Sequence, residues 1–85
     1  MERHLKGVAN HRRIEILFLI AKNNGISIDH IAECLDCNVK TISGHTYRLY
    51  HSGLINKYNK GRNVTHELSP YGKIIYKFLT TFSHS

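Results

Sequence analysis

Residues 38–55 read NVKTISGHTYRLYHSGLI, and most of the expected fold follows from them. Asn38 is a favoured helix N-cap, and Gly53 is typical of the position just past a helix end. A helix is therefore predicted from about Val39 to Ser52, and its 3.6-residue period gives it two faces. The inward residues are Ile42, His45, Thr46 and Leu49. The outward residues are Lys40, Ser43, Gly44, Tyr47 and His51.

Upstream of this helix, the sequence indicates two more helices. A first helix is predicted from Asn10, as its N-cap, to the stop signal Asn23-Asn24-Gly25. Its apolar face comprises Ile14, Leu17, Phe18 and Ala21. Ser27 is expected to cap a short second helix with a buried stripe of Ile28, Ile31, Ala32 and Leu35. The turn Asp36-Cys37-Asn38 then leads into the third helix, which is the spacing of a helix-turn-helix motif.

Downstream of Gly53, the pattern changes from helix to hairpin. Strands are predicted over residues 54–58 and 64–68, joined by a basic turn over residues 59–63. Ser69-Pro70 combines an N-cap with proline at the first helical position, so a last helix is expected to start there. We therefore predict a mainly α fold with a small β-hairpin, a winged helix-turn-helix in the order helix-helix-helix-hairpin-helix, as a single domain over residues 1–85.

The charges are distributed unevenly along the chain. The 85 residues include twelve Lys and Arg and six Asp and Glu, a formal net charge of +6. Residues 1–37 hold five basic and five acidic residues, whereas residues 38–66 hold five basic residues and no acidic one. A block of one sign predicts an anionic partner, such as nucleic acid or acidic lipid.

Several classes of protein are not expected. No apolar run approaches the ~18 residues of a membrane-spanning helix. The charged start lacks the apolar segment of a secretion signal, and two cysteines are too few for a disulfide-stapled scaffold, so a cytoplasmic protein with reduced thiols is expected. There is no Gly-rich phosphate loop, no carboxylate pair in a plausible cleft and no nucleophile with an evident base, so neither an enzyme nor a bound cofactor is expected.

Four segments of the sequence carry a resemblance to a known family. The run from Thr41 to His45, with Leu49 and residues 52–55, resembles the recognition helix of ArsR-type winged-helix regulators. Residues 10–17 are similar to the first-helix signature of that family, Gly61-Arg62 to its wing tip, and residues 68–70 to its entry into the last helix. The resemblance covers residues 5–82. MarR-type and several archaeal and viral winged-helix proteins share most of these features and stay open as alternatives.

The resemblance implies a sequence-specific regulator of transcription that binds double-stranded DNA, by default a repressor. Its recognition helix would enter the major groove, where Thr41 and Ser43 donate hydrogen bonds and Tyr47 contacts the backbone or a thymine methyl. Arg62 at the wing tip would contact phosphate or the minor groove. The predicted DNA-binding residues are Lys40, Thr41, Ser43, Gly44, Tyr47, Arg48, Lys57, Lys60 and Arg62.

Two departures from the family pattern bear on this interface. Gly44 stands where the family often has Arg, and a mid-helix glycine costs about 1 kcal/mol relative to alanine. Either the backbone approaches DNA or a neighbouring helix closely there, or the position is degenerate. Thr46 replaces a usually buried Leu, which predicts lighter packing. Arg12 and Arg13 either add a phosphate contact or, for one of them, pair with an acid such as Glu33.

The cysteines and histidines offer a weak metal motif. Cys34 and Cys37 form a C-x-x-C, and His30 precedes Cys34 by four residues, so the three side chains could bind Zn²⁺. A site of this kind needs further ligands, and the arsenic-binding run of the ArsR family is not present. We therefore predict two ordinary reduced cysteines and no metal. His66, on the second strand, is expected at the surface or near a DNA phosphate.

The last helix carries more apolar residues than one core can cover. Its apolar residues are Tyr71, Ile74, Ile75, Phe78, Leu79 and Phe82. Either Ile75 and Phe82 are exposed and the others pack on the first helix, or the reverse holds. An exposed stripe usually marks a partner surface, so a homodimer through the last and first helices is predicted. The alternative function is a protein-interaction module whose basic face binds an acidic partner.

Overall fold

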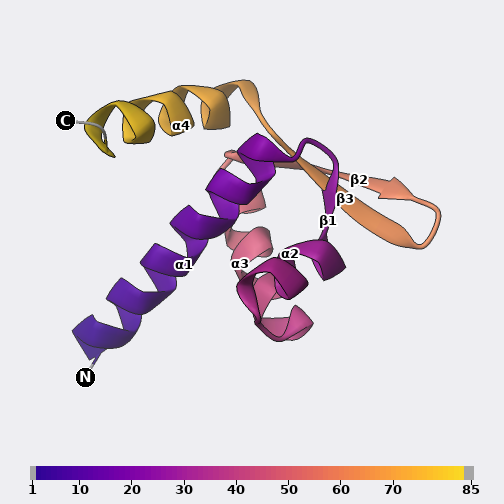
Figure 1. Cartoon of the computed structure of the whole chain (residues 1–85), viewed down its shortest axis with the longest axis horizontal. Helices are drawn as coiled ribbons and strands as arrows, with labels where there is room; N and C mark the ends of the chain where they lie inside the picture. The colour runs from indigo at the N-terminus through magenta and orange to yellow at the C-terminus, as the bar shows by residue number, and fades with distance from the viewer. Residues whose placement is uncertain (1, 84–85) are drawn as a thin grey trace.

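The computed structural model describes the backbone of residues 2–83 and the side chains of residues 10–81. It shows the predicted mainly helical fold with a small β-hairpin (Figure 1). The elements in chain order are α1 (Glu2–Lys22), β1 (Ile26–Ser27), α2 (Ile28–Leu35), α3 (Val39–His51), β2 (Ile55–Lys60), β3 (Asn63–Leu68) and α4 (Pro70–Ser83). Helix α1 contacts α3 and α4, and the β2–β3 hairpin projects from the helices as a wing.

The sheet differs from the prediction in two ways. It has three strands in the order β1-β3-β2, all antiparallel, and the two-residue β1 pairs Ile26 with His66. The predicted turn over residues 59–63 is wrong, because β2 and β3 continue to the pair Lys60–Asn63 and leave only Gly61 and Arg62 between them. Gly61 has a φ of 61°, the left-handed conformation that a two-residue hairpin turn needs at its first position.

Local capping bonds fix where the helices begin. The Ser27 hydroxyl accepts from the His30 N–H at 3.2 Å, and Asn38 Oδ1 accepts from the Lys40 N–H at 2.8 Å. The Ser69 hydroxyl accepts from the Gly72 N–H at 2.9 Å, which starts α4 at Pro70 as predicted. These three caps are confirmed.

The predicted start of α1 is wrong. Asn10 lies inside a helix that begins at Glu2, and its Oδ1 accepts a hydrogen bond from the guanidinium of Arg13 instead of capping the backbone. The predicted apolar face is also turned. Ile14 is 42% exposed, whereas Ile16, Leu17 and Ile20 are buried. The predicted face points partly toward α4, where the Phe18 and Tyr76 rings meet edge to face with centroids 5.1 Å apart.

Helix α4 matches neither predicted arrangement in full, because Leu79 packs inward together with Ile75 whereas Tyr71, Ile74 and Phe78 are exposed. Ile75 and Leu79 pack against the core beside Tyr76. Tyr71, Ile74 and Phe78 are 54%, 66% and 58% exposed, and the Phe82 side chain lies outside the described residues. The core itself is formed by α1, α2, α3 and the sheet, with Ile16, Ile31, Ile42, Ile55 and Leu68 among its buried residues. Among the described residues, no helix is long and apolar enough to cross a membrane.

Two glycines in helices provide a test of this packing. A Cβ on Gly72 would lie 1.9 Å from the Leu54 carbonyl oxygen, whereas a Cβ on Gly44 would meet nothing within 4 Å. We expect Gly72→Ala to lower the free energy of unfolding by about 1–3 kcal/mol through overpacking. Gly44→Ala, the matched control, should raise it by up to about 1 kcal/mol through helix propensity. Urea denaturation of both variants checks this, and equal effects would contradict the packing of α4 on Leu54.

Candidate nucleic-acid interface

Helix α3 presents one polar face to solvent. Its buried residues are Ile42, Thr46 and Leu49, with His45 half-buried beside them. The Thr46 hydroxyl, fully buried, donates to the Ser43 carbonyl at 3.1 Å, so the polar group that replaces a leucine is hydrogen-bonded. All six predicted DNA-binding residues of this helix are exposed: Lys40, Thr41, Ser43, Gly44, Tyr47 and Arg48.

The outward half of α3 near its C-terminus carries a chain of aromatic rings. The Tyr47 and His51 ring centroids lie 4.2 Å apart, and those of Tyr50 and His51 lie 5.5 Å apart. Tyr47 and Tyr50 are 58% and 47% exposed. Tyr50 is not among the predicted DNA-binding residues, although its spacing of three residues from Tyr47 places the two side chains on neighbouring positions of the helix.

Lys57 is separated from the other cations of the wing. Its Nζ lies 5.8 Å from the centroid of the Tyr50 ring, within the range of a cation–π contact. The side chain is half-buried, and burial lowers the pKa of Lys57. Because side chains alternate along a strand, Lys57 shares the face of buried Ile55, so it joins the base of the wing to α3.

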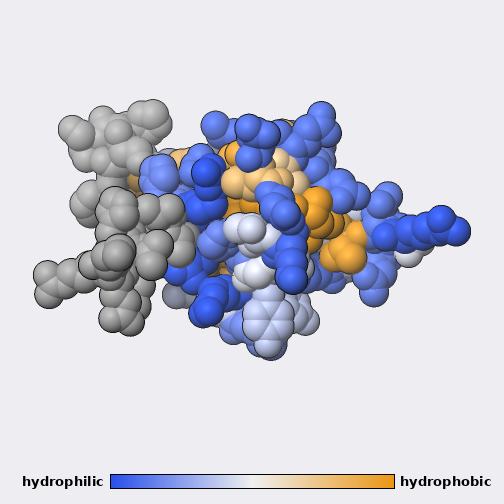
Figure 2. All heavy atoms as spheres, turned by 90° about the horizontal axis from the view of Figure 1, so that it is seen from below, coloured by the Kyte–Doolittle hydropathy of each residue, from blue (hydrophilic) through white to orange (hydrophobic). Residues whose placement is uncertain are grey.

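The tip of the wing carries Lys60 and Arg62, both exposed. Figure 2 shows the wing as a mostly hydrophilic projection with apolar residues at its base. On the strands behind the tip, the Tyr58 hydroxyl donates to Glu67 Oε1 at 2.7 Å. This hydrogen bond to Glu67 is the main reason why the pKa of Tyr58 is raised. Glu67 is thus engaged across the hairpin, and neither Lys60 nor Arg62 forms an ion pair within the described residues.

The prediction for His66 is wrong, because this residue is fully buried. Its Nδ1 lies 3.0 Å from the Ile26 carbonyl oxygen, so Nδ1 carries the proton and donates to β1. Its Nε2 is buried with no hydrogen-bond partner among the described residues. Burial lowers the pKa of His66, the bond to Ile26 opposes this, and the Lys57 ammonium lowers it further. His66 is therefore a neutral core residue that ties β3 to β1.

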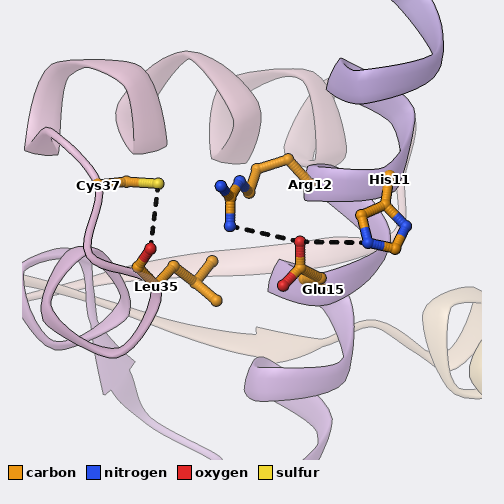
Figure 3. A network of polar contacts seen from close by, with 5 residues as sticks. All are labelled: His11, Arg12, Glu15, Leu35 and Cys37. Carbon is orange, nitrogen blue, oxygen red and sulfur yellow. Dashed lines mark hydrogen bonds and ion pairs between the residues drawn. The ribbon is translucent and has the colours of Figure 1, made fainter.

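Three arginines gather where α1 meets α3. Arg12 Nη1 lies 3.4 Å from Glu15 Oε1, and His11 Nε2 lies 3.6 Å from the same oxygen (Figure 3). The acidic partner of Arg12 is therefore Glu15 and not Glu33, which was the predicted candidate. The pKa of His45 on α3 is lowered, first by burial and then by the charges of Arg13, Arg12 and Arg48. The sequence could not show this cluster, because its members come from two helices far apart in the chain.

A groove of about 770 Å³ opens between α1, α3 and α4. Arg13 and Arg48 both line it, one from each of the two helices. Its apolar lining includes Ile14, Leu17, Leu49, Ile75 and Leu79.

The two thiols lie at the end of α2. Cys34 is exposed and Cys37 half-buried, both are free, and the Cys37 thiol donates to the Leu35 carbonyl at 3.4 Å (Figure 3). The described residues contain no group of three or more His, Cys, Asp or Glu side chains that could hold a metal ion. His30 is exposed on the first turn of α2. The absence of metal stays a prediction from the sequence.

The fold and the exposed basic surface of α3 and the wing define a winged helix-turn-helix protein. The chain belongs to the HVO_A0114 family, whose model matches residues 8–75. No curated protein sequence matches it significantly.

Solved structures of regulators share this fold. FabT from Streptococcus pneumoniae, solved in complex with DNA, has a TM-score of 0.80 at 17% identity over 85% of this chain and 52% of its own. MarR has a TM-score of 0.81 at 23% identity over 92% of this chain and 61% of its own. Reduced HlyU from Vibrio cholerae has a TM-score of 0.76 at 28% identity over 92% of this chain and 82% of its own. The chain thus spans about half the length of FabT. The neighbours include MarR-type regulators, and the ArsR-type assignment stays a prediction.

The buried His66 predicts a pH dependence of stability. Its pKa in the folded protein lies below the ordinary 6.5, so the unfolded chain takes up the proton at higher pH. The contribution of neutral His66 is therefore full above about pH 6.5 and is lost as the pH falls toward the lowered folded pKa. We expect the free energy of unfolding to decrease between about pH 7.5 and about pH 5.5.

The variant His66→Gln should show a smaller decrease over the same interval, whatever its stability at neutral pH. Urea denaturation at both pH values measures this difference directly. The exposed His30→Gln is the matched control and should keep the decrease of the parent protein. An unchanged decrease in His66→Gln would contradict the assignment of the pH dependence to this residue.

Proposed function

We propose that this protein is a sequence-specific regulator of transcription that binds double-stranded DNA and represses by occupying a promoter. The observation that carries the proposal is the exposure of four basic residues on α3 and the wing: Lys40, Arg48, Lys60 and Arg62. No acidic residue occurs between residues 38 and 66 to neutralise them. Such a surface attracts the phosphates of DNA, and their counterions are released on binding.

The shape of α3 supports docking in the major groove. The face centred on Lys40, Gly44 and Tyr47 is polar, exposed and opposite the buried residues of the helix. Lys40, Thr41 and Ser43 lie in the first turns, where their side chains can donate to phosphate oxygens or base edges. The open space around Gly44 leaves room for a close approach of the helix to DNA. Tyr47 can contact the sugar-phosphate backbone or a thymine methyl.

The wing supports a second contact beside the recognition helix. Lys60 and Arg62 lie at the tip of a hairpin that projects away from the helices (Figure 1). At this position they can bind phosphates, and Arg62 can enter a narrow minor groove. FabT, which has the same fold at 17% identity, was solved with DNA, and this agrees with the proposal.

A homodimer completes the proposal. The exposed residues Tyr71 and Ile74 form an apolar stripe on α4, and Ile14 is exposed on the neighbouring α1. Burial of this surface against a second copy would remove it from water and, by two-fold symmetry, set two recognition helices about 34–36 Å apart on a pseudo-palindromic site.

DNA binding is tested by titration of a fluorescent random-sequence duplex at several salt concentrations. Neutralisation of about five phosphates predicts a slope of log affinity against log salt near −4 to −5. Lys40→Ala and Arg62→Ala should each weaken binding and reduce the slope by about 1. Lys77→Ala on α4 is the matched control, since Lys77 is exposed outside the proposed surface. A flat salt response would instead favour the protein-interaction module, and equal loss in all three variants would contradict the docking.

The dimer is tested with Ile74→Glu. Ile74 is 66% exposed, so the substitution leaves the core of one chain intact and places a charge in the proposed interface. We expect analytical ultracentrifugation to show a dimer for the parent protein and a monomer for Ile74→Glu. Lys73→Glu, an exposed position on a different side of α4 from Tyr71 and Ile74, should stay dimeric. A parent protein that sediments as a monomer at all concentrations would contradict the dimer.

A further inference from the structure

Helix α3 has basic neighbours on two opposite sides. On one side, Tyr50 contacts Lys57, which belongs to β2 at the base of the wing. On the other side, His45 and Arg48 are one helical turn apart and face α1. Arg13 of α1 and Arg48 of α3 both line the groove where the two helices meet. The recognition face of α3 therefore lies between the wing and a second basic cluster.

This second cluster has few counter-charges. The only ion pairs within the described residues are those of Glu15. Its Oε1 lies 3.4 Å from Arg12 Nη1 and 3.6 Å from His11 Nε2. Arg13 donates to the neutral Asn10 side chain. Arg12, Arg13 and Arg48 all act on the half-buried imidazole of His45 and disfavour its protonation. Three guanidiniums act on His45, and within the described residues only that of Arg12 is paired with a carboxylate, so an excess of positive charge remains that an anion would stabilise.

We propose that Arg13 and Arg48 together bind one DNA backbone phosphate on the side of α3 opposite the wing, with Arg12 and His45 as supporting neighbours. The inference rests on the proposed function and adds to it a contact from α1. The major groove is about 12 Å wide and is bordered by two phosphate backbones. The wing contacts the backbone on one side of α3, and the arginine pair contacts the backbone on the other side.

The chemistry of arginine fits this role. A guanidinium offers five N–H donors in a planar fork that matches phosphate oxygens, and two forks from different helices can hold one phosphate from two directions. Contacts of this kind carry no sequence information, but they fix the position and rotation of the recognition helix over the bases. Arg13 and Arg48 thus act as positioning residues for the face of Lys40 and Tyr47.

The test uses Arg13→Gln and Arg48→Gln on the random-sequence duplex, since a phosphate contact does not depend on sequence. Each variant should reduce the slope of log affinity against log salt by about 0.9 and weaken binding at low salt. Because the two residues share one phosphate, the double variant should lose less than the sum of the single losses. Lys22→Gln is the matched control: it removes one charge from an exposed position at the C-terminal end of α1, nine residues beyond Arg13, and should change neither quantity.

The outcomes separate this inference from the proposed function. A steep slope in the parent protein that is equally steep in both arginine variants would overturn the phosphate contact and leave DNA binding intact. A slope reduced equally in Lys22→Gln would show a general effect of net charge and would also overturn it. If the parent protein does not bind duplex at low salt, the proposed function fails and the inference falls with it.

A second readout reports on the cluster directly. A phosphate placed between Arg13 and Arg48 neutralises charges that disfavour protonation of His45, so the NMR-measured pKa of His45 should rise when the parent protein is saturated with duplex. In the double variant the duplex should move this pKa much less. An unchanged value in the parent protein on saturation would contradict a phosphate at this place. The same spectra show whether each variant is folded.

Discussion

The burial of Ile42, Thr46 and Leu49 fixes the rotation of α3 about its own axis, and the proposed interface depends on this rotation. Burial of an Ile or Leu side chain contributes about 1.5–3 kcal/mol. A helix turned by one residue would expose these side chains and bring the charged Arg48 toward the core, which is far more costly. The exposure of Lys40, Gly44 and Tyr47 thus follows from the packing on the opposite side of the helix.

The parts of the fold that the sequence predicted are those decided by a few neighbouring residues. Ser27, Asn38 and Ser69 cap helices through hydrogen bonds to backbone groups two or three residues away, so their pattern is visible in a short window. The exposed face of α3 is predictable for the same reason, because its period is local. Asn10 shows the limit of such signals, since a residue favoured at a cap also occurs inside a helix when the chain before it continues the helix.

The parts that sequence reasoning missed depend on contacts between distant segments. Nothing near His66 in the chain indicates that β1, forty residues earlier, covers its side chain. Nor does it indicate that the Ile26 carbonyl of β1 accepts a hydrogen bond from the imidazole. The contact of Lys57 with Tyr50 requires the base of the wing to lie against α3, and the cluster of Arg13 and Arg48 requires α1 to cross the same helix. In each case the residue is visible in the sequence, but its contact partner is known only from the way the helices and strands pack together.

Two features of the basic surface cost stability and have no compensation within the described residues. Gly44 stands in the middle of α3, where alanine would be more favourable by about 1 kcal/mol and would meet no neighbouring atom. Arg12, Arg13 and Arg48 concentrate like charge around His45, and within the described residues only Arg12 has an acidic partner, Glu15. Proteins commonly break one or two local stability rules at their functional sites. Both departures fall on α3 or on the side of α1 that faces it, so the cost in folding energy is concentrated on the surface that we propose to bind DNA.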